Sequence, residues 1–387
     1  MSPRARFAFA WYFHLPAIAT EVEVRDHIRG SLEPLMRLHR EARRPYLLAP
    51  TGSFLRHCLA VSPETVATMR DELVAGRMSL AGTYLYETDP LSIPWIILGA
   101  QVGEDLALKE ALLGERPRWF FLPNFVWRAG FERLLAAQGI EGILTDSRQL
   151  AASSRARSWR WETTAEGPVH VGAVEVPTAD WEHRRIGLLR GPTARLRVAF
   201  RDWTVTRRLS FGNDGAIHRT DAEAEVASAL KDIEDCIEPD DLIVIADDGD
   251  RIRGTSLPGY RSLLRETGGA VDWRSLLTER PATPPLRELP SYTPPGMATV
   301  LRESEDAKFY WSLLEEARSF DWSAAERRDL LALDDVFYSY WPGVARRQWY
   351  VEQALDRIEL GARRSGLTEE PRGDPEHPTA DREPWHV

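Results

Sequence analysis

Short apolar segments alternate with segments of helical periodicity over the first 275 residues of the chain. The apolar segments are rich in aliphatic and aromatic residues and are bounded by turn formers, as buried strands are. They lie at 7–13, 46–50, 78–84, 119–123, 140–146 and 241–250. Apolar residues at helical spacing lie between them, at 24–43, 62–76, 99–114, 130–139 and 224–237. This alternation predicts parallel strands joined by helices.

The length of the chain favours a closed barrel over an open sheet. A (β/α) barrel takes about 250 residues, and the chain has 387. No GxGxxG or Walker-type glycine loop is present, which weakens the doubly wound nucleotide-binding alternative. We therefore expect an α/β fold with a barrel over residues 1–277, including a less regular stretch at 150–215.

The C-terminal part has a different composition. Six prolines lie between 278 and 300, which predicts a connector, and residues 301–364 have the pattern of a helical region. The segment 365–387 carries six acids and two arginines, so it contributes 2 − 6 = −4 of the net charge of −10. We expect this acidic tail to be disordered.

Composition and charge exclude several classes of function. The remaining charge of about −6 argues against nucleic acid or an anionic membrane as the main partner. Two cysteines are too few for a disulfide framework, and no apolar run reaches the ~20 residues of a membrane span. The N-terminus has the charge order of a signal peptide, but His14 and Pro16 interrupt its apolar part, so a strand and a cytoplasmic protein are expected.

Polar residues follow nearly every predicted strand. Function in a parallel barrel lies at the C-terminal ends of the strands, so these side chains are expected to surround one site. Each one alone has a simpler explanation as a helix cap, a turn residue or a satisfied core residue. The strand-end residues are His14, Glu87, Asp89, Asn124, Asp146, Asp247, Asp248 and Asp250.

Several stretches, in order, resemble the motifs of glycoside hydrolase family 57. They are FHLP (13–16), GRMSLAGTYLYETDPLSIP (76–94), GERPRWFFLPNFVW (114–127), FRDWTVTRRLSFG (200–212), IVIADDGDRIRG (243–254) and SYWPG (339–343). This resemblance implies an incomplete, seven-stranded TIM-like barrel with a C-terminal helical region packed on it. It also implies a retaining enzyme acting on α-glucans.

The resemblance assigns roles to single residues. Asp248 is at the position of the general acid/base, whereas the nucleophile position is occupied by Asn124. His14, Glu87 and Asp250 are at substrate-binding positions. Trp341 belongs to the last motif, where Pro342 replaces the family's histidine.

Asn124 leaves two interpretations of the site open. A neutral amide is a poor nucleophile, and a retaining glycosidase needs two carboxyl groups about 5–5.5 Å apart. Glu87 or Asp89 could supply the missing carboxylate, an inverting reaction could use a water, or a substrate acetamido group could attack. The alternative is a catalytically inactive glycan-binding pseudoenzyme, in which Asn124 and tryptophans hold sugar rings.

Metal-dependent deacetylation is a third class, and the sequence argues against it. Such a site takes an aspartate with two histidines, commonly as His-x-x-x-His, and none of the nine histidines forms that pair. We therefore expect no metal and no cofactor, and an oligosaccharide or polysaccharide as the ligand. The sequence gives no indication of the oligomeric state.

Overall fold

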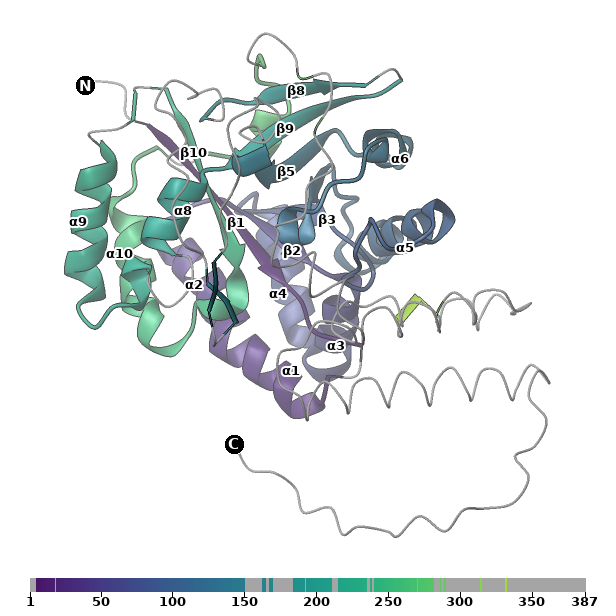
Figure 1. Cartoon of the computed structure of the whole chain (residues 1–387). Coiled ribbons are helices and arrows are strands. Elements are labelled where there is room, and N and C mark those ends of the chain that lie inside the picture. The colour runs from purple at the N-terminus through teal and green to yellow at the C-terminus, as the bar shows by residue number, and fades with distance from the viewer. Residues whose placement is uncertain are drawn as a thin grey trace.

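Seven parallel strands close into a barrel (Figure 1). Their order around the ring is β10, β1, β2, β3, β4, β5 and β9, and β9 pairs back with β10. The strands are β1 (Arg6–Phe13), β2 (Tyr46–Pro50), β3 (Met78–Gly82), β4 (Trp119–Phe121), β5 (Gly142–Asp146), β9 (Arg195–Arg201) and β10 (Leu242–Asp248). The ring confirms the expected seven-stranded (β/α) barrel.

The computed structural model describes only part of the chain. The described residues are 5–17, 19–149, 162–164, 167–169, 184–191, 193–210, 215–234, 237–238, 240–269, 271–281, 286, 289, 314 and 331–332. Most of the predicted connector, most of the predicted helical region and all of the acidic tail lie outside them, as do Trp341 and Pro342. These assignments stay predictions.

Strand alternation decides which side chains fill the barrel. Residues on one face of β1, such as Ala8 and Ala10, cluster with inward residues of all the other barrel strands. Residues on its other face, such as Phe9 and Trp11, pack among the helices. Near the N-terminal end, the indole of Trp273 donates to the carbonyl of Phe9 at 2.9 Å, so α11 (Trp273–Leu276) closes that end.

Helices surround the strands. Figure 1 shows α2, α8, α9 and α10 on one side of the barrel and α5 and α6 on another. The helices are α1 (Glu21–His27), α2 (Glu33–Ala42), α3 (Gly52–Val61), α4 (Pro63–Val74), α5 (Trp95–Leu113), α6 (Phe131–Ala137), α8 (Trp203–Leu209), α9 (Ala222–Glu234) and α10 (Leu257–Glu266). None of the described helices is both long and apolar enough to cross a membrane.

Several elements differ from the sequence expectation. The predicted helix over 24–43 is α1 and α2 joined through a π-helical segment, Ile28–Leu32. The segment of α3 was not predicted, although Thr51 caps it by accepting from the Phe54 amide at 3.2 Å. The β6–β7 hairpin (Glu162–Thr164 and Gly167–Val169) is a separate two-stranded sheet, and β8 (Gly187–Arg190) pairs antiparallel with β9.

Candidate active site

The last inward-facing residue of four barrel strands, at the C-terminal side of the barrel, is polar. Tyr12 of β1 and Asp248 of β10 are neighbours in register, and both continue the inward face of their strands. Asp146 of β5 and Arg201 of β9 are paired in the same way. The apolar interior therefore ends in a polar layer, as parallel barrels place their sites.

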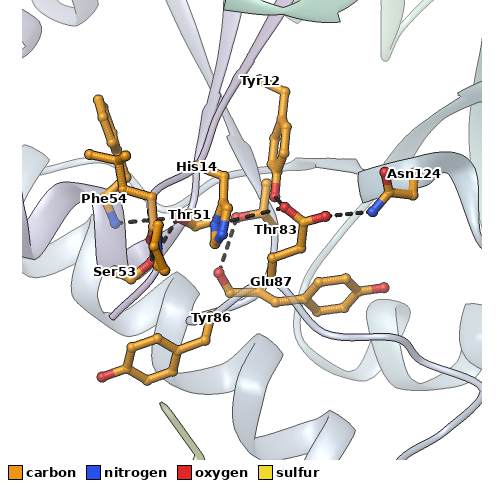
Figure 2. Close-up of polar contacts among 12 residues, drawn as sticks. Tyr12, His14, Thr51, Ser53, Phe54, Thr83, Tyr86, Glu87 and Asn124 are labelled. Atoms are coloured by element: carbon orange, nitrogen blue, oxygen red, sulfur yellow. Dashed lines mark hydrogen bonds and ion pairs between the residues drawn. The ribbon is translucent and has the colours of Figure 1, made fainter. Parts of the chain in front are cut away.

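Glu87 joins this layer through a hydrogen bond with Tyr12. One carboxylate oxygen accepts from the Tyr12 hydroxyl at 2.7 Å, and the other accepts from the Asn124 amide at 2.5 Å (Figure 2). Nδ1 of His14 lies 3.8 Å from the first of these oxygens, and the His14 ring stacks on Tyr12. The structure thus brings together Glu87, Asn124 and His14, which are far apart in the sequence.

The segment that carries Glu87 is anchored by a row of buried polar residues on α5. Gln101, Asp105 and Lys109 are one helical turn apart, and all three are fully buried. The Tyr86 amide donates to Gln101 at 3.0 Å, and the Thr83 amide donates to Asp105 at 2.8 Å. This row, defined as the α5 polar row, holds the extended chain that leads to Glu87.

Asn124 stands in an unusual backbone conformation. Its φ of 51° and ψ of 9° lie in the left-handed region, where asparagine is favoured over most residues. Together with Pro123 and Phe125 it forms a short 3-10 turn after β4. The turn directs the amide toward Glu87 (Figure 2).

Asp248 has the electrostatics of a proton donor. Desolvation by the surrounding protein, with the neighbouring carboxylates of Asp250 and Asp247, raises its pKa to about 7, and Glu87 adds to this rise. Arg251 opposes the shift from 3.2 Å. The Asp248 side chain is still 45% exposed, so a ligand can reach its tip although the protein crowds it.

Asp250 lies against α1 and the π-helical segment that follows it. Its carboxylate lies 3.7 Å from Nε2 of His27, and its carbonyl accepts from Ser31 at 3.0 Å. Between the two acids, Gly249 packs so closely on Phe13 that a Cβ there would lie 2.2 Å from the ring. The DGD turn therefore needs its glycine, and Asp250 acts on Asp248 mainly through charge.

Two strand-end acids have structural roles. Asp89 accepts from the amide of Leu91 and the hydroxyl of Ser92, so it stabilises its own turn. Asp146 pairs with Arg148 and Arg201, and although burial opposes the charged form, the two guanidinium groups lower its pKa to about 2. Asp89 is 1% exposed, so its carboxylate cannot reach a ligand and cannot act as a substitute nucleophile.

The sequence analysis missed two residues of the site. Tyr12 binds Glu87, and Arg251 pairs with Asp248. Tyr12 could have been found by alternation, because it shares a strand face with Ala8 and Ala10. Arg251 is three residues after Asp248, within reach of its carboxylate. Among the described residues, no three His, Cys, Asp or Glu side chains are grouped so as to hold a metal ion.

The comparison with protein families decides the classification. The sequence model described as Glycosyl hydrolase family 57 matches residues 10–261, which include all seven barrel strands apart from the start of β1. The chain belongs to glycosyl hydrolase family 57. No curated protein matches the sequence significantly.

Several solved structures share the fold. A branching enzyme of the family from Thermococcus kodakaraensis is 13% identical, with 93% of this chain and 89% of that chain covered and a TM-score of 0.69. A branching enzyme from Pyrococcus horikoshii is 11% identical, with 96% and 98% covered and a TM-score of 0.67. The 4-alpha-glucanotransferase from Thermococcus litoralis is 15% identical with a TM-score of 0.61; 82% of this chain aligns, but it spans only 46% of that protein.

Proposed function

We propose that this family 57 protein binds an α-glucan or a related oligosaccharide at the C-terminal end of the barrel and acts on its glycosidic bond. Asp248 protonates the glycosidic oxygen, and the polar layer around Glu87 and His14 binds the sugar hydroxyls. The branching enzymes and the glucanotransferase that share the fold support this substrate class.

The observation that carries the proposal is the half-exposed carboxyl of Asp248, whose partner in register is Tyr12, together with the hydrogen bonds from Tyr12 and Asn124 to Glu87. With its pKa raised to about 7, Asp248 can carry a proton near neutral pH. Both oxygens of Glu87 accept hydrogen bonds, an arrangement that stabilises a carboxylate anion. A carboxyl group that can give up a proton, next to fixed hydrogen-bonding groups that can hold a sugar, suits the cleavage of a glycosidic bond.

A specific observation also supports a second candidate, a glycan-binding pseudoenzyme. The resemblance to the family's motif implies that Asn124 is at the nucleophile position, and its amide donates to Glu87. In this form the site would retain hydrogen-bond donors and acceptors for sugar hydroxyls without a group that attacks the anomeric carbon.

Incubation with maltooligosaccharides and aryl α-glucosides separates the two candidates. We expect product release that Asp248→Asn lowers by about 10²–10⁴-fold, because the amide cannot donate the catalytic proton. The rate of the wild-type protein should fall as the pH rises above about 7, where Asp248 loses its proton. Absence of product, together with calorimetric binding of the same sugars, would identify the pseudoenzyme. If neither product formation nor sugar binding is detected, the proposed carbohydrate function is wrong.

A further inference from the structure

The turn that carries Asp248 is in contact with the first helical segment of the chain. Nε2 of His27, the last residue of α1, lies 3.7 Å from the carboxylate of Asp250. Ser31, in the π-helical segment that follows, donates to the backbone carbonyl of Asp250 at 3.0 Å. Single π-helical turns frequently lie at functional sites. This segment therefore holds Asp250 both by its side chain and by its backbone, two residues after Asp248.

The other ring nitrogen of His27 is fixed by its own helix. Nδ1 lies 2.9 Å from the backbone carbonyl of Glu23. A carbonyl can only accept a hydrogen bond, so Nδ1 carries a hydrogen whether or not the ring is charged. In the neutral ring Nε2 then presents a lone pair, which repels the Asp250 carboxylate, whereas in the imidazolium it presents an N–H. The contact between His27 and Asp250 is attractive only when the ring is charged.

His27 changes its charge near neutral pH. Burial disfavours the charged ring, and Arg253, which is paired with Asp26 at 3.0 Å, adds to this effect. The carboxylate of Asp250 and the carbonyl of Glu23 favour the charged ring, and the pKa of His27 is raised above 6.5 as a result. The His27 side chain is 18% exposed, so protons from solvent can reach it.

Asp250 carries the effect of His27 to Asp248. After burial, the charge of Asp250 is the largest cause of the raised pKa of Asp248. An imidazolium next to Asp250 offsets part of this negative charge. When His27 loses its proton, the charge of Asp250 acts on Asp248 without that offset, and Asp248 holds its own proton more strongly. Arg251, 3.2 Å from Asp248, stays charged over the same pH range.

We propose that His27 is a positioning residue that controls the charge beside Asp248, because its imidazolium pairs with Asp250 and its neutral ring does not. The catalytic meaning of this control rests on the proposed function of the preceding subsection, in which Asp248 is the acid. As the pH rises through neutrality, the loss of the proton from His27 opposes the loss of the proton from Asp248. The acid therefore stays protonated to a higher pH than it would beside a permanently charged pair.

Thermal melting measures the protonation of Asp248 without any sugar. The difference in melting midpoint between Asp248→Asn and its parent grows from about pH 4 and levels off at the folded-state pKa of Asp248, about 7. In a His27→Gln background we expect this levelling-off about 0.5 pH units higher, because no cation offsets Asp250. In a His27→Lys background we expect it about 0.5 pH units lower, because the cation persists. A residue with a purely structural role would not give shifts whose sign follows its charge.

Asp250→Asn provides the control within the pair. It should lower the levelling-off by about 1 pH unit, because it removes the neighbouring negative charge. Adding His27→Gln to Asp250→Asn should cause no further shift, since His27 without its carboxylate is already neutral near pH 7. Asp232→Asn, which changes an exposed carboxylate on α9, should leave the levelling-off unchanged.

The alkaline limb of the rate of sugar cleavage should shift with the same signs. If one His27 variant does not fold, the sign of the shift in the other decides. No shift, shifts of equal sign in His27→Gln and His27→Lys, or a His27→Gln shift that persists with Asp250→Asn would overturn the inference and leave the proposed function intact. If no sugar is cleaved, the proposed function is wrong, and the melting measurement still decides whether His27 controls the charge beside Asp248.

Discussion

Single residues in the polar layer are strained or charged in ways that favour function over stability. Asn124 keeps a left-handed backbone, and Asp248 lies among other carboxylates that disfavour its charged form. Residues that bind or react commonly carry such costs, which the rest of the fold offsets. Asp248 allows this idea to be measured directly.

We expect Asp248→Asn to stabilise the protein at alkaline pH. Because its pKa is raised to about 7 in the folded state, the folded protein binds more protons than the unfolded chain between about pH 4 and 7. Stability is therefore lost as the pH rises through 7, and a neutral asparagine avoids this loss. Thermal melting should show similar midpoints near pH 4 and a higher midpoint for the variant at pH 8. An equal difference in melting midpoint between the variant and the wild type at both pH values would contradict the raised pKa of Asp248.

At the scale of elements, α5 buries a row of polar residues, and its sequence alone did not predict this burial. The helix was predicted from its periodicity, but polar residues on a helix ordinarily indicate a solvent-exposed face. Here Gln101, Asp105 and Lys109 point inward, because the strand end and the loop after β3 leave backbone groups that need partners. The sequence pattern of a buried row of polar residues is the same as that of a solvent-exposed row. The two can be distinguished only when the position of the neighbouring strand is known.

We expect Lys109→Met to destabilise the fold by about 3–5 kcal/mol, because it leaves the charge of Asp105 buried without its partner. Lys109 contacts Asp105 at 2.7 Å, and both side chains are 0% exposed. Urea unfolding of the variant measures the loss. Lys231→Met, on the exposed side of α9, is the matched control and should change stability by less than about 0.5 kcal/mol. A comparable change in the two variants would show that the α5 polar row does not anchor the fold.

For the whole molecule, the seam between β9 and β10 completes the ring. The two strands share one pair in register, Val244 with Arg201, and Arg201 also binds Asp146 of β5 and the carbonyl of Ala246. A buried arginine thus connects three strands where backbone pairing is sparse. The seam depends on Asp146, because this carboxylate neutralises the guanidinium.

We expect Asp146→Ala to cost about 3–5 kcal/mol at pH 7, because an uncompensated charge remains buried at the seam. The wild-type carboxylate has a pKa of about 2, so its contribution is present above about pH 4 and is lost as the pH falls toward 2. Denaturant unfolding at pH 7 and pH 3 should therefore show a smaller difference at the lower pH. Asp232→Ala, which removes an exposed ion pair with Arg208, should have little effect at either pH.

The sequence predicted the barrel better than the contacts of its site. Apolar runs identified six of the seven barrel strands, whereas the arginines in 195–201 kept β9 from being assigned. Two of these arginines, Arg197 and Arg201, lie on the inward face and find partners there, which only the closed ring makes possible. In the same way, the motifs identified Asn124 and Glu87, but their hydrogen bond depends on how two loops meet in space.

Gln101 connects the site to a distant part of the chain. While its side-chain oxygen holds the Tyr86 amide, its side-chain nitrogen donates to the carbonyl of Leu331 at 2.8 Å, and Leu331 packs in the same apolar cluster as Leu85 and Tyr86. The same side-chain amide therefore ties the peptide next to Glu87 to a residue 230 positions later in the sequence, and loss of the Leu331 contact would remove one of the two partners that fix the orientation of this amide.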